Sequence, residues 1–216
     1  MQTIQNTFMR CEMKYLVTCE QRKALTKVIE QYMNPDEFGK STICNVYYDT
    51  PDMRMVRHSI EQPVYKEKLR MRSYGRTSND SCVFVELKKK YRDVVYKRRV
   101  SMSLSQAEGY LAGETNSPKY NQIVNEIDYI LKEYKGIAPA MYVAYDRTAY
   151  FGKEDQGFRI TFDENILWRE TELSLSSEVY GKPLMDEGQS LLEVKISSAM
   201  PLWLSPTPTR RCGAGV

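Results

Sequence analysis

Basic side chains occur at every second position in several short stretches of this chain. The stretch 65–74 carries four of them, Lys66, Lys68, Arg70 and Arg72. Successive side chains of a β-strand point to opposite faces, so these four would share one face of a strand. A row of ammonium and guanidinium groups can bind an anion, and one guanidinium can bind two phosphate oxygens. The pattern therefore indicates, first of all, the binding of a phosphate-rich anion.

Five other stretches show the same alternation, with apolar residues at most of the intervening positions. Their polar positions are Arg10, Glu12 and Lys14; Glu86, Lys88 and Lys90; Lys97 and Arg99; Arg159, Thr161 and Asp163; and Glu193 and Lys195. Tyr145 and Arg147 fit less cleanly, because Asp146 between them then falls on the apolar side. Six strands thus repeat one pattern, an apolar face and a mainly basic face.

Two interpretations of these faces are open. For a single strand, a half-buried sheet with a solvated charged face is the usual explanation. For the whole set, the scarcity of uncharged polar residues and the repulsion between like charges on neighbouring strands favour a bound anion. If the sheet closes into a barrel, the charged face lines the interior and helices cover the apolar face. An open sheet with a basic platform is the alternative.

Carboxylates among the basic residues indicate a second kind of chemistry. Four of them could hold Mg²⁺ or Mn²⁺, which prefer oxygen ligands: Glu12, Glu86, Asp163 and Glu193. A salt bridge with a neighbouring lysine or arginine is the alternative for each, and it is favoured for Glu12 and Glu86. The predicted metal ligands are Glu193, Glu12 and Asp163.

The elements that must position these groups are mostly strands with inserted helices, which predicts an α+β protein. Strands are expected at 8–17, 43–50, 65–74, 82–91, 93–103, 139–151, 158–163, 166–171 and 191–196. A capping box at Thr18 and Gln21 starts a helix that Asn34-Pro35 ends. Further helices are expected after Pro51, from Ser105, and over 123–134 with the apolar spacing of an amphipathic helix.

Length and composition set further limits. The 216 residues suit one domain, predicted over 1–204, and the proline-containing stretch 205–216 is expected to be a disordered tail. The net charge is only +3, so an anion site must come from the arrangement of charges. Five cysteines without CxxC spacing and a single histidine argue against a disulfide framework, a zinc site or a histidine-based triad. With no apolar leader or long apolar run, a cytoplasmic location is expected.

The ordered charged runs resemble the VTC (vacuolar transporter chaperone) domain. This is the polyphosphate polymerase branch of the triphosphate tunnel metalloenzymes, or CYTH-like superfamily. The matching runs lie between about residues 8 and 204: RCEMKY at 10–15, YYDT at 47–50, KLRMRSYG at 68–75, VELK at 85–88, KRR at 97–99, YDR at 145–147, RITFD at 159–163 and LEVK at 192–195. The resemblance implies an antiparallel eight-stranded β-barrel, the triphosphate tunnel, with flanking helices.

The resemblance also implies an activity, the transfer of the γ-phosphoryl of ATP onto a polyphosphate chain beside Mn²⁺ or Mg²⁺. The implied phosphate-binding residues are Lys14, Arg70, Arg72, Lys88, Lys97, Arg147 and Arg159, and all of these except Lys97 are predicted to be catalytic. The alternating faces add Arg10, Lys68, Arg99, Tyr145 and Lys195 as phosphate-binding candidates. Glu193 is implied to bind the metal.

One departure from the family keeps other functions open. After residues 200–204 the family continues to a Ser-Phe-Ser-Lys-Tyr-like closing segment, which residues 205–216 do not resemble, so either the chain is truncated or part of the site is lost. The alternatives are a triphosphate or nucleoside triphosphate hydrolase of the same fold, with Glu12 or Glu86 orienting water, and a non-catalytic polyphosphate sensor. A single-stranded nucleic-acid binder on an open basic sheet is a fourth. The expected partners are ATP and polyphosphate, pyrophosphate or triphosphate, with no specific nucleic acid and no membrane segment. Protein partners are left open.

Overall fold

The computed structural model describes residues 7–8, 11–92, 94–116, 121–196 and 200–204. Arg10 and the predicted disordered tail 205–216 lie outside the described residues. The chain forms two compact units, which are described separately below. Unit 1 draws on Met1–Phe8, Ile43–Ala144 and Trp168–Lys182, and unit 2 on Met9–Thr42, Tyr145–Leu167 and Pro183–Val216.

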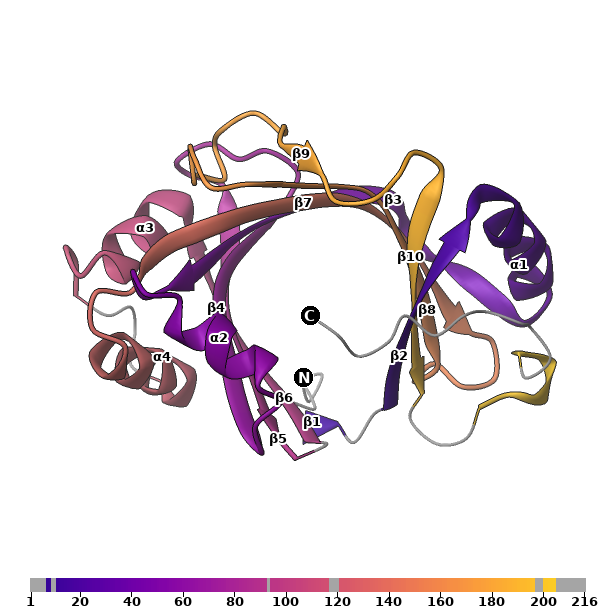
Figure 1. Ribbon diagram of the computed structural model, residues 1–216, viewed down its shortest axis with the longest axis horizontal. Helices are drawn as coiled ribbons and strands as arrows, with labels where there is room; N and C mark the ends of the chain where they lie inside the picture. Colours follow the sequence, from indigo (N-terminus) through magenta and orange to yellow (C-terminus); the bar gives the residue numbers. More distant parts are fainter. Residues whose placement is uncertain (1–6, 9–10, 93, 117–120, 197–199, 205–216) are drawn as a thin grey trace. The chain divides into compact units, whose positions relative to one another are not determined.

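The predicted α+β class with antiparallel strands is confirmed (Figure 1). In chain order the elements are β1 (Thr7–Phe8), β2 (Cys11–Thr18), α1 (Cys19–Tyr32), β3 (Met33–Asp49), α2 (Arg54–Ile60), β4 (Tyr65–Tyr74), β5 (Cys82–Tyr91), β6 (Val94–Ser103), α3 (Leu104–Leu111), α4 (Gln122–Glu133), β7 (Ala138–Gly152), β8 (Arg159–Arg169), β9 (Lys182–Pro183), β10 (Gln189–Ile196) and the 3₁₀ turn η1 (Leu202–Leu204). Eight of the strands in the described ranges have eight or more residues, whereas β1 and β9 have two each.

The strands pair in the order β1-β6-β5-β4-β3-β7-β8-β10-β2, and β9 pairs with β8. For the described residues this order has two ends, β1 and β2, and its eight long strands match the number that the resemblance to the triphosphate tunnel implies. β3, β7 and β8 each begin in one unit and end in the other. The long strands therefore contribute residues to both units.

Unit 1 has its hydrophobic core between the β4–β6 strands and two helices, α3 and α4 (Figure 1). α3 begins with a capping box in which Ser103 and Gln106 bond each other's backbone N–H groups, and Asn121 caps α4. Alternate apolar residues of the strands pack against the helices. The fully buried side chains of this core include Leu69, Val85 and Leu87 from the strands and Leu104, Ile127 and Ile130 from the helices. Burying each such side chain stabilises the fold by about 1.5–3 kcal/mol. The polar residues of these strands are thereby left on the opposite face.

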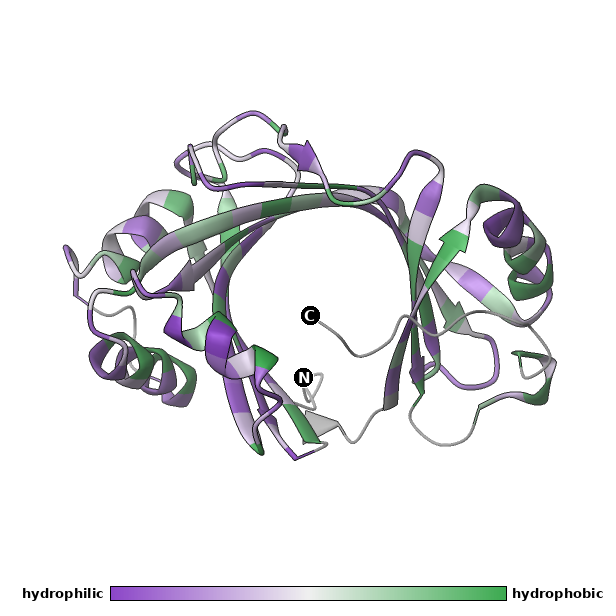
Figure 2. Cartoon of the chain, in the orientation of Figure 1, coloured by the Kyte–Doolittle hydropathy of each residue, from purple (hydrophilic) through white to green (hydrophobic). Residues whose placement is uncertain are grey.

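Unit 2 has a second core, formed by α1 on the strands β2, β8 and β10. The predicted capping box of Thr18 and Gln21 is present at the start of α1. Leu25 and Ile29 of the helix pack with apolar residues of the strands, which include Val17, Ile160, Phe162, Leu192 and Val194. Trp203 of η1 stacks on Tyr32 at the end of α1, with ring centroids 4.8 Å apart. In Figure 2, hydrophilic and hydrophobic residues are mixed along the strands and helices.

Two strand predictions need correction. The expected strands 158–163 and 166–171 are one continuous strand, β8, which runs through Asn165 although that residue adopts a positive φ of 49°. β3 starts at Met33 rather than at 43, ten residues earlier than the apolar pattern indicates. Its first part is largely exposed and polar, so hydrophobic alternation could not reveal it. Within the described ranges, no helix has both the length and the apolar character that spanning a membrane requires.

Candidate functional site

The register of three strands gathers the basic candidates of unit 1 on one face. Lys68 of β4 lies opposite Lys88 of β5, which lies opposite Lys97 of β6. In the next row Arg70 lies opposite Glu86, which lies opposite Arg99. Like charges directly opposite each other destabilise a sheet. The three lysines of this row therefore repel one another, and a bound anion would reduce that repulsion.

Glu86 is the acidic centre of the unit 1 cluster, which consists of Lys68, Arg70, Arg72, Glu86, Lys88, Lys97 and Arg99. Its carboxylate accepts hydrogen bonds from Arg70 Nε at 2.9 Å and Nη2 at 2.7 Å, and Lys97 Nζ lies 2.7 Å away. Burial opposes ionisation of Glu86, but Arg70, Lys97 and Arg72 outweigh it and lower its pKa to about 2. Such a carboxylate is a poor general base near neutral pH, which weakens the hydrolase alternative that assigns it that role.

Two residues that the sequence prediction missed hold the arginines of this cluster. The buried Asn45 accepts a hydrogen bond from Arg72 Nε at 2.8 Å and donates one to the Val143 carbonyl at 3.0 Å. Tyr47 accepts a hydrogen bond from Arg70 Nη1 at 3.0 Å. Burial raises the pKa of Tyr47, but Arg70 and its neighbours lower it by more. Alternation along β3 could have revealed both residues, since they occupy polar positions between buried apolar ones.

Lys97 of the unit 1 cluster has a lowered pKa. Burial lowers the pKa of Lys97 to about 8, and the attraction of Glu86 offsets only part of this effect. The side chain is nevertheless 44% exposed, so a ligand can reach its ammonium group. Its charge is therefore present at neutral pH and is lost in mildly alkaline solution.

Unit 2 contains a second cluster, centred on Glu193 of β10. In the strand register Glu193 lies between Lys14 of β2 and Thr161 of β8. Lys195 Nζ is 3.0 Å from Glu193 Oε2, while Lys14 Nζ and Arg147 Nη2 approach its carboxylate oxygens to 3.8 and 3.9 Å. Burial opposes ionisation of Glu193, but Lys195 and Lys14 outweigh it and lower its pKa to about 2. We call Lys14, Arg147, Thr161, Asp163, Glu193 and Lys195 the unit 2 cluster.

Arg147 and Arg159, the predicted arginines of unit 2 that the structure describes, are both held by carboxylates. Arg147 donates from Nε and Nη2 to the two oxygens of Asp163, each at 2.6 Å, and its guanidinium lies over the Tyr145 ring at 5.1 Å. Arg159 instead pairs with Asp36 at 2.8 Å, a residue to which no sequence signal pointed. The two arginines thus have different partners, although both lie on polar strand positions.

Asp146, which did not fit the alternation, has its own polar partners. It accepts a hydrogen bond from Thr42 at 2.8 Å and one from Asn165 at 2.9 Å, and Lys40 lies 3.6 Å away. Burial opposes its ionisation, but Asn165, Thr42 and Lys40 outweigh it and lower its pKa. Asp146 therefore stays charged without joining the unit 2 cluster.

The predicted metal ligands Glu193, Glu12 and Asp163 have different surroundings in the structure. In the part of the chain that the structure describes, no three His, Cys, Asp or Glu side chains are grouped so as to hold a metal ion. Glu12 lies opposite Lys195 in the register, and Asp163 is engaged by Arg147. Glu193 remains as an ionised carboxylate. Mg²⁺ is commonly bound through one or two carboxylates together with substrate phosphates, so Glu193 fits that kind of site but not an all-protein cage.

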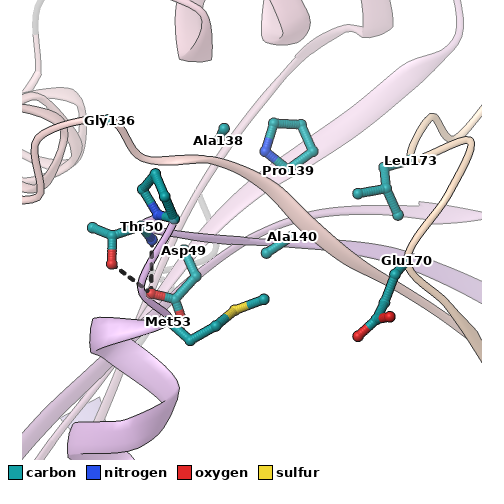
Figure 3. Close-up of a pocket in the computed structure, with 10 residues that line it drawn as sticks. Asp49, Thr50, Met53, Gly136, Ala138, Pro139, Ala140, Glu170 and Leu173 are labelled. Atoms are coloured by element: carbon teal, nitrogen blue, oxygen red, sulfur yellow. Dashed lines mark hydrogen bonds between the residues drawn. The ribbon is translucent and has the colours of Figure 1, made fainter.

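A cavity of about 250 Å³ in unit 1 is formed by residues other than the clusters (Figure 3). It is lined by Asp49, Thr50, Pro51, Met53, Gly136, Ala138, Pro139, Ala140, Glu170 and Leu173. Asp49 accepts hydrogen bonds from the backbone N–H groups of Met55 at 2.8 Å and Val56 at 2.9 Å, so it caps α2. The run at 47–50 therefore has two roles, since Tyr47 holds Arg70 and Asp49 accepts hydrogen bonds from the first turn of α2.

Comparison with known proteins gave one family and several solved structures. The model of the VTC domain matches residues 9–210. A putative adenylate cyclase from Bacillus halodurans is similar with a TM-score of 0.55 and 15% identity, covering 90% of this chain and 83% of that one. A putative adenylate cyclase from Vibrio parahaemolyticus has a TM-score of 0.46 and 14% identity, over 93% and 82% of the two chains. No curated protein matches the chain significantly.

Proposed function

The chain belongs to the VTC domain family, and from this we propose that it transfers the γ-phosphoryl group of ATP onto a polyphosphate chain. The likeness to the Bacillus structure confirms the fold, and the family supports a protein that handles phosphoryl groups. The observation that carries the finer proposal is the unit 1 cluster. There, lysines stand directly opposite one another, and arginines are held in place by Glu86, Asn45 and Tyr47.

Phosphoryl transfer needs little covalent chemistry from the protein and depends on positioning and charge. Arg70 and Arg72 are already oriented by hydrogen bonds, so phosphate binding would cost little side-chain entropy. Lys68, Lys88 and Lys97 would each neutralise phosphate oxygens, and an anion across the row would relieve their mutual repulsion. In this proposal the unit 1 cluster binds and orients a chain of phosphates.

In the reaction itself, a terminal oxygen of the polyphosphate chain forms a bond to the γ-phosphorus. The bond from that phosphorus to the β–γ bridging oxygen breaks, and ADP leaves with the electron pair. Separately, Lys14, Arg147 and Arg159 of unit 2 are proposed to bind phosphate oxygens. Glu193 would hold Mn²⁺ or Mg²⁺ together with the substrate phosphates, and that ion supplies further charge neutralisation.

The test is to incubate the protein with ATP and Mn²⁺ or Mg²⁺ and to identify the products. Release of ADP with the appearance of long phosphate chains is expected. Arg70→Ala and Lys88→Ala should each slow the reaction at least tenfold, because each removes a charge-assisted contact with phosphate. Arg76→Ala is the matched control. Arg76 follows β4 but is 56% exposed and paired with Glu178 outside the cluster, so its loss should leave the rate unchanged.

Other products would select the other functions considered. Free orthophosphate without chains would identify a hydrolase, in which water replaces the polyphosphate as nucleophile. Tight triphosphate binding without turnover would identify a sensor, and a stronger affinity for oligonucleotides would identify a nucleic-acid binder. ATP and polyphosphate are the proposed partners, with pyrophosphate or triphosphate as shorter ligands. The cytoplasmic location stays a prediction.

A further inference from the structure

The hydroxyl group of Thr161 is buried without a hydrogen-bond partner among the described residues. Thr161 is 5% exposed, and its Oγ1 is hidden from solvent. It lies on β8 midway between Arg159 and Asp163 and directly opposite Glu193 on β10. Alternation along the strand places its side chain on the polar face of unit 2. The unpaired hydroxyl therefore belongs to the charged cluster and not to the hydrophobic core.

Such a hydroxyl lowers stability. Burying a hydroxyl without a partner loses the hydrogen bonds that it makes with water in the unfolded chain. Valine has nearly the same shape and suits a strand equally well, but it would not incur this loss. Native proteins leave few buried polar groups unpaired, and such groups often mark a functional role. Here the surroundings point to the role, because Lys14, Lys195 and Arg147 all approach the carboxylate opposite Thr161.

We propose that Thr161 is a phosphate-binding residue, whose hydroxyl donates a hydrogen bond to a phosphate oxygen held by the cations of the unit 2 cluster. The inference rests on the proposed function, since its ligand is a phosphate chain. In the structure described, Lys195 pairs with Glu193 and Arg147 pairs with Asp163. When they turn to a bound phosphate, the hydroxyl gains an acceptor. Removing the hydroxyl should then change stability and affinity in opposite directions.

The experiment compares Thr161→Val with Thr161→Ser. Without ligand, the valine variant should melt about 2–4 °C above the wild type, because the unpaired hydroxyl is gone. In titration calorimetry with inorganic triphosphate and Mg²⁺, it should bind about tenfold more weakly, which corresponds to about 1.4 kcal/mol. The serine variant keeps the hydroxyl and should stay within about twofold of the wild-type affinity.

Thr77→Val is the matched control. Thr77 lies between β4 and β5, is 9% exposed, and also has a buried hydroxyl without a partner among the described residues, but it belongs to neither cluster. Its valine variant should melt higher with unchanged triphosphate affinity. If the wild type and Thr161→Val bind triphosphate equally well, the role of Thr161 is refuted but the proposed function is not. Weaker binding together with a lower melting temperature would also overturn it, since the hydroxyl would then be structural. A wild type that binds no triphosphate would overturn the proposed function and this inference together.

Discussion

Replacing Glu86 with glutamine should destabilise the protein, because Glu86 is the buried counter-ion of three cations. The carboxylate is 2% exposed, and its pKa falls from the ordinary 4.5 to about 2. At 1.36 kcal/mol per pKa unit, this difference corresponds to about 3 kcal/mol of favourable interaction. Glutamine keeps an oxygen that can accept a hydrogen bond from Arg70. We therefore expect the free energy of unfolding at pH 7 to fall by about 2 kcal/mol and not by the full amount.

The pH dependence of this loss identifies its cause. A carboxylate with a lowered pKa contributes stability above its unfolded-state pKa, and that contribution disappears as pH falls through the folded-state value. The gap between wild type and Glu86→Gln should therefore be full at pH 5 and above, and should shrink between about pH 4.5 and about pH 2. Urea unfolding followed by circular dichroism at several pH values measures it.

An exposed ion pair provides the control for Glu86→Gln. Glu133 is 46% exposed and lies 3.4 Å from Arg54, so Glu133→Gln should change the free energy of unfolding by less than about 0.5 kcal/mol. The reasoning fails if Glu86→Gln is as stable as the wild type at pH 7. It also fails if the gap stays constant down to the most acidic pH measured, since the loss would then not come from an ionised carboxylate.

Two further predictions concern the affinity of the unit 1 cluster for triphosphate. The affinity of the wild type for triphosphate should fall above about pH 8, because Lys97 loses its proton there. The Lys97→Arg variant should show no such fall, because a guanidinium stays charged. Calorimetry from about pH 7 to about pH 9.5 checks this, and an equal loss of affinity with pH in both proteins would contradict it. Asn45→Ala should lower the free energy of unfolding by about 1–3 kcal/mol and weaken triphosphate binding several-fold, since the Nε of Arg72 loses its acceptor. Urea unfolding and calorimetry measure the two effects, and unchanged affinity would show that Asn45 does not position Arg72.

Much of the fold was predictable because its strands have a strict period of two. The alternation along 65–74 and 82–91 predicted β4 and β5 at their observed bounds. The capping box of Thr18 and Gln21 predicted the start of α1, because this motif depends only on two residues three positions apart in the sequence. The early part of β3 was not predictable in this way, since an exposed polar strand carries no hydrophobic signal.

The candidate site was predictable only in part. Residue types and alternation identified the cations, but they did not indicate that Asn45 and Tyr47 hold two of them or that Asp36 pairs with Arg159. These partners lie on other segments, 27, 23 and 123 residues away in the chain. Alternation within one strand cannot reveal such a contact.

The sequence by itself determined which side chains lie on the polar face of each strand, because alternation is a local property of an extended backbone. Only the tertiary structure decided which of these charges meet. Strand register placed Arg70 and Lys97 around Glu86, and it placed Lys14 opposite Glu193. Register depends on pairing between distant segments, and a shift of one residue would have exchanged the two faces.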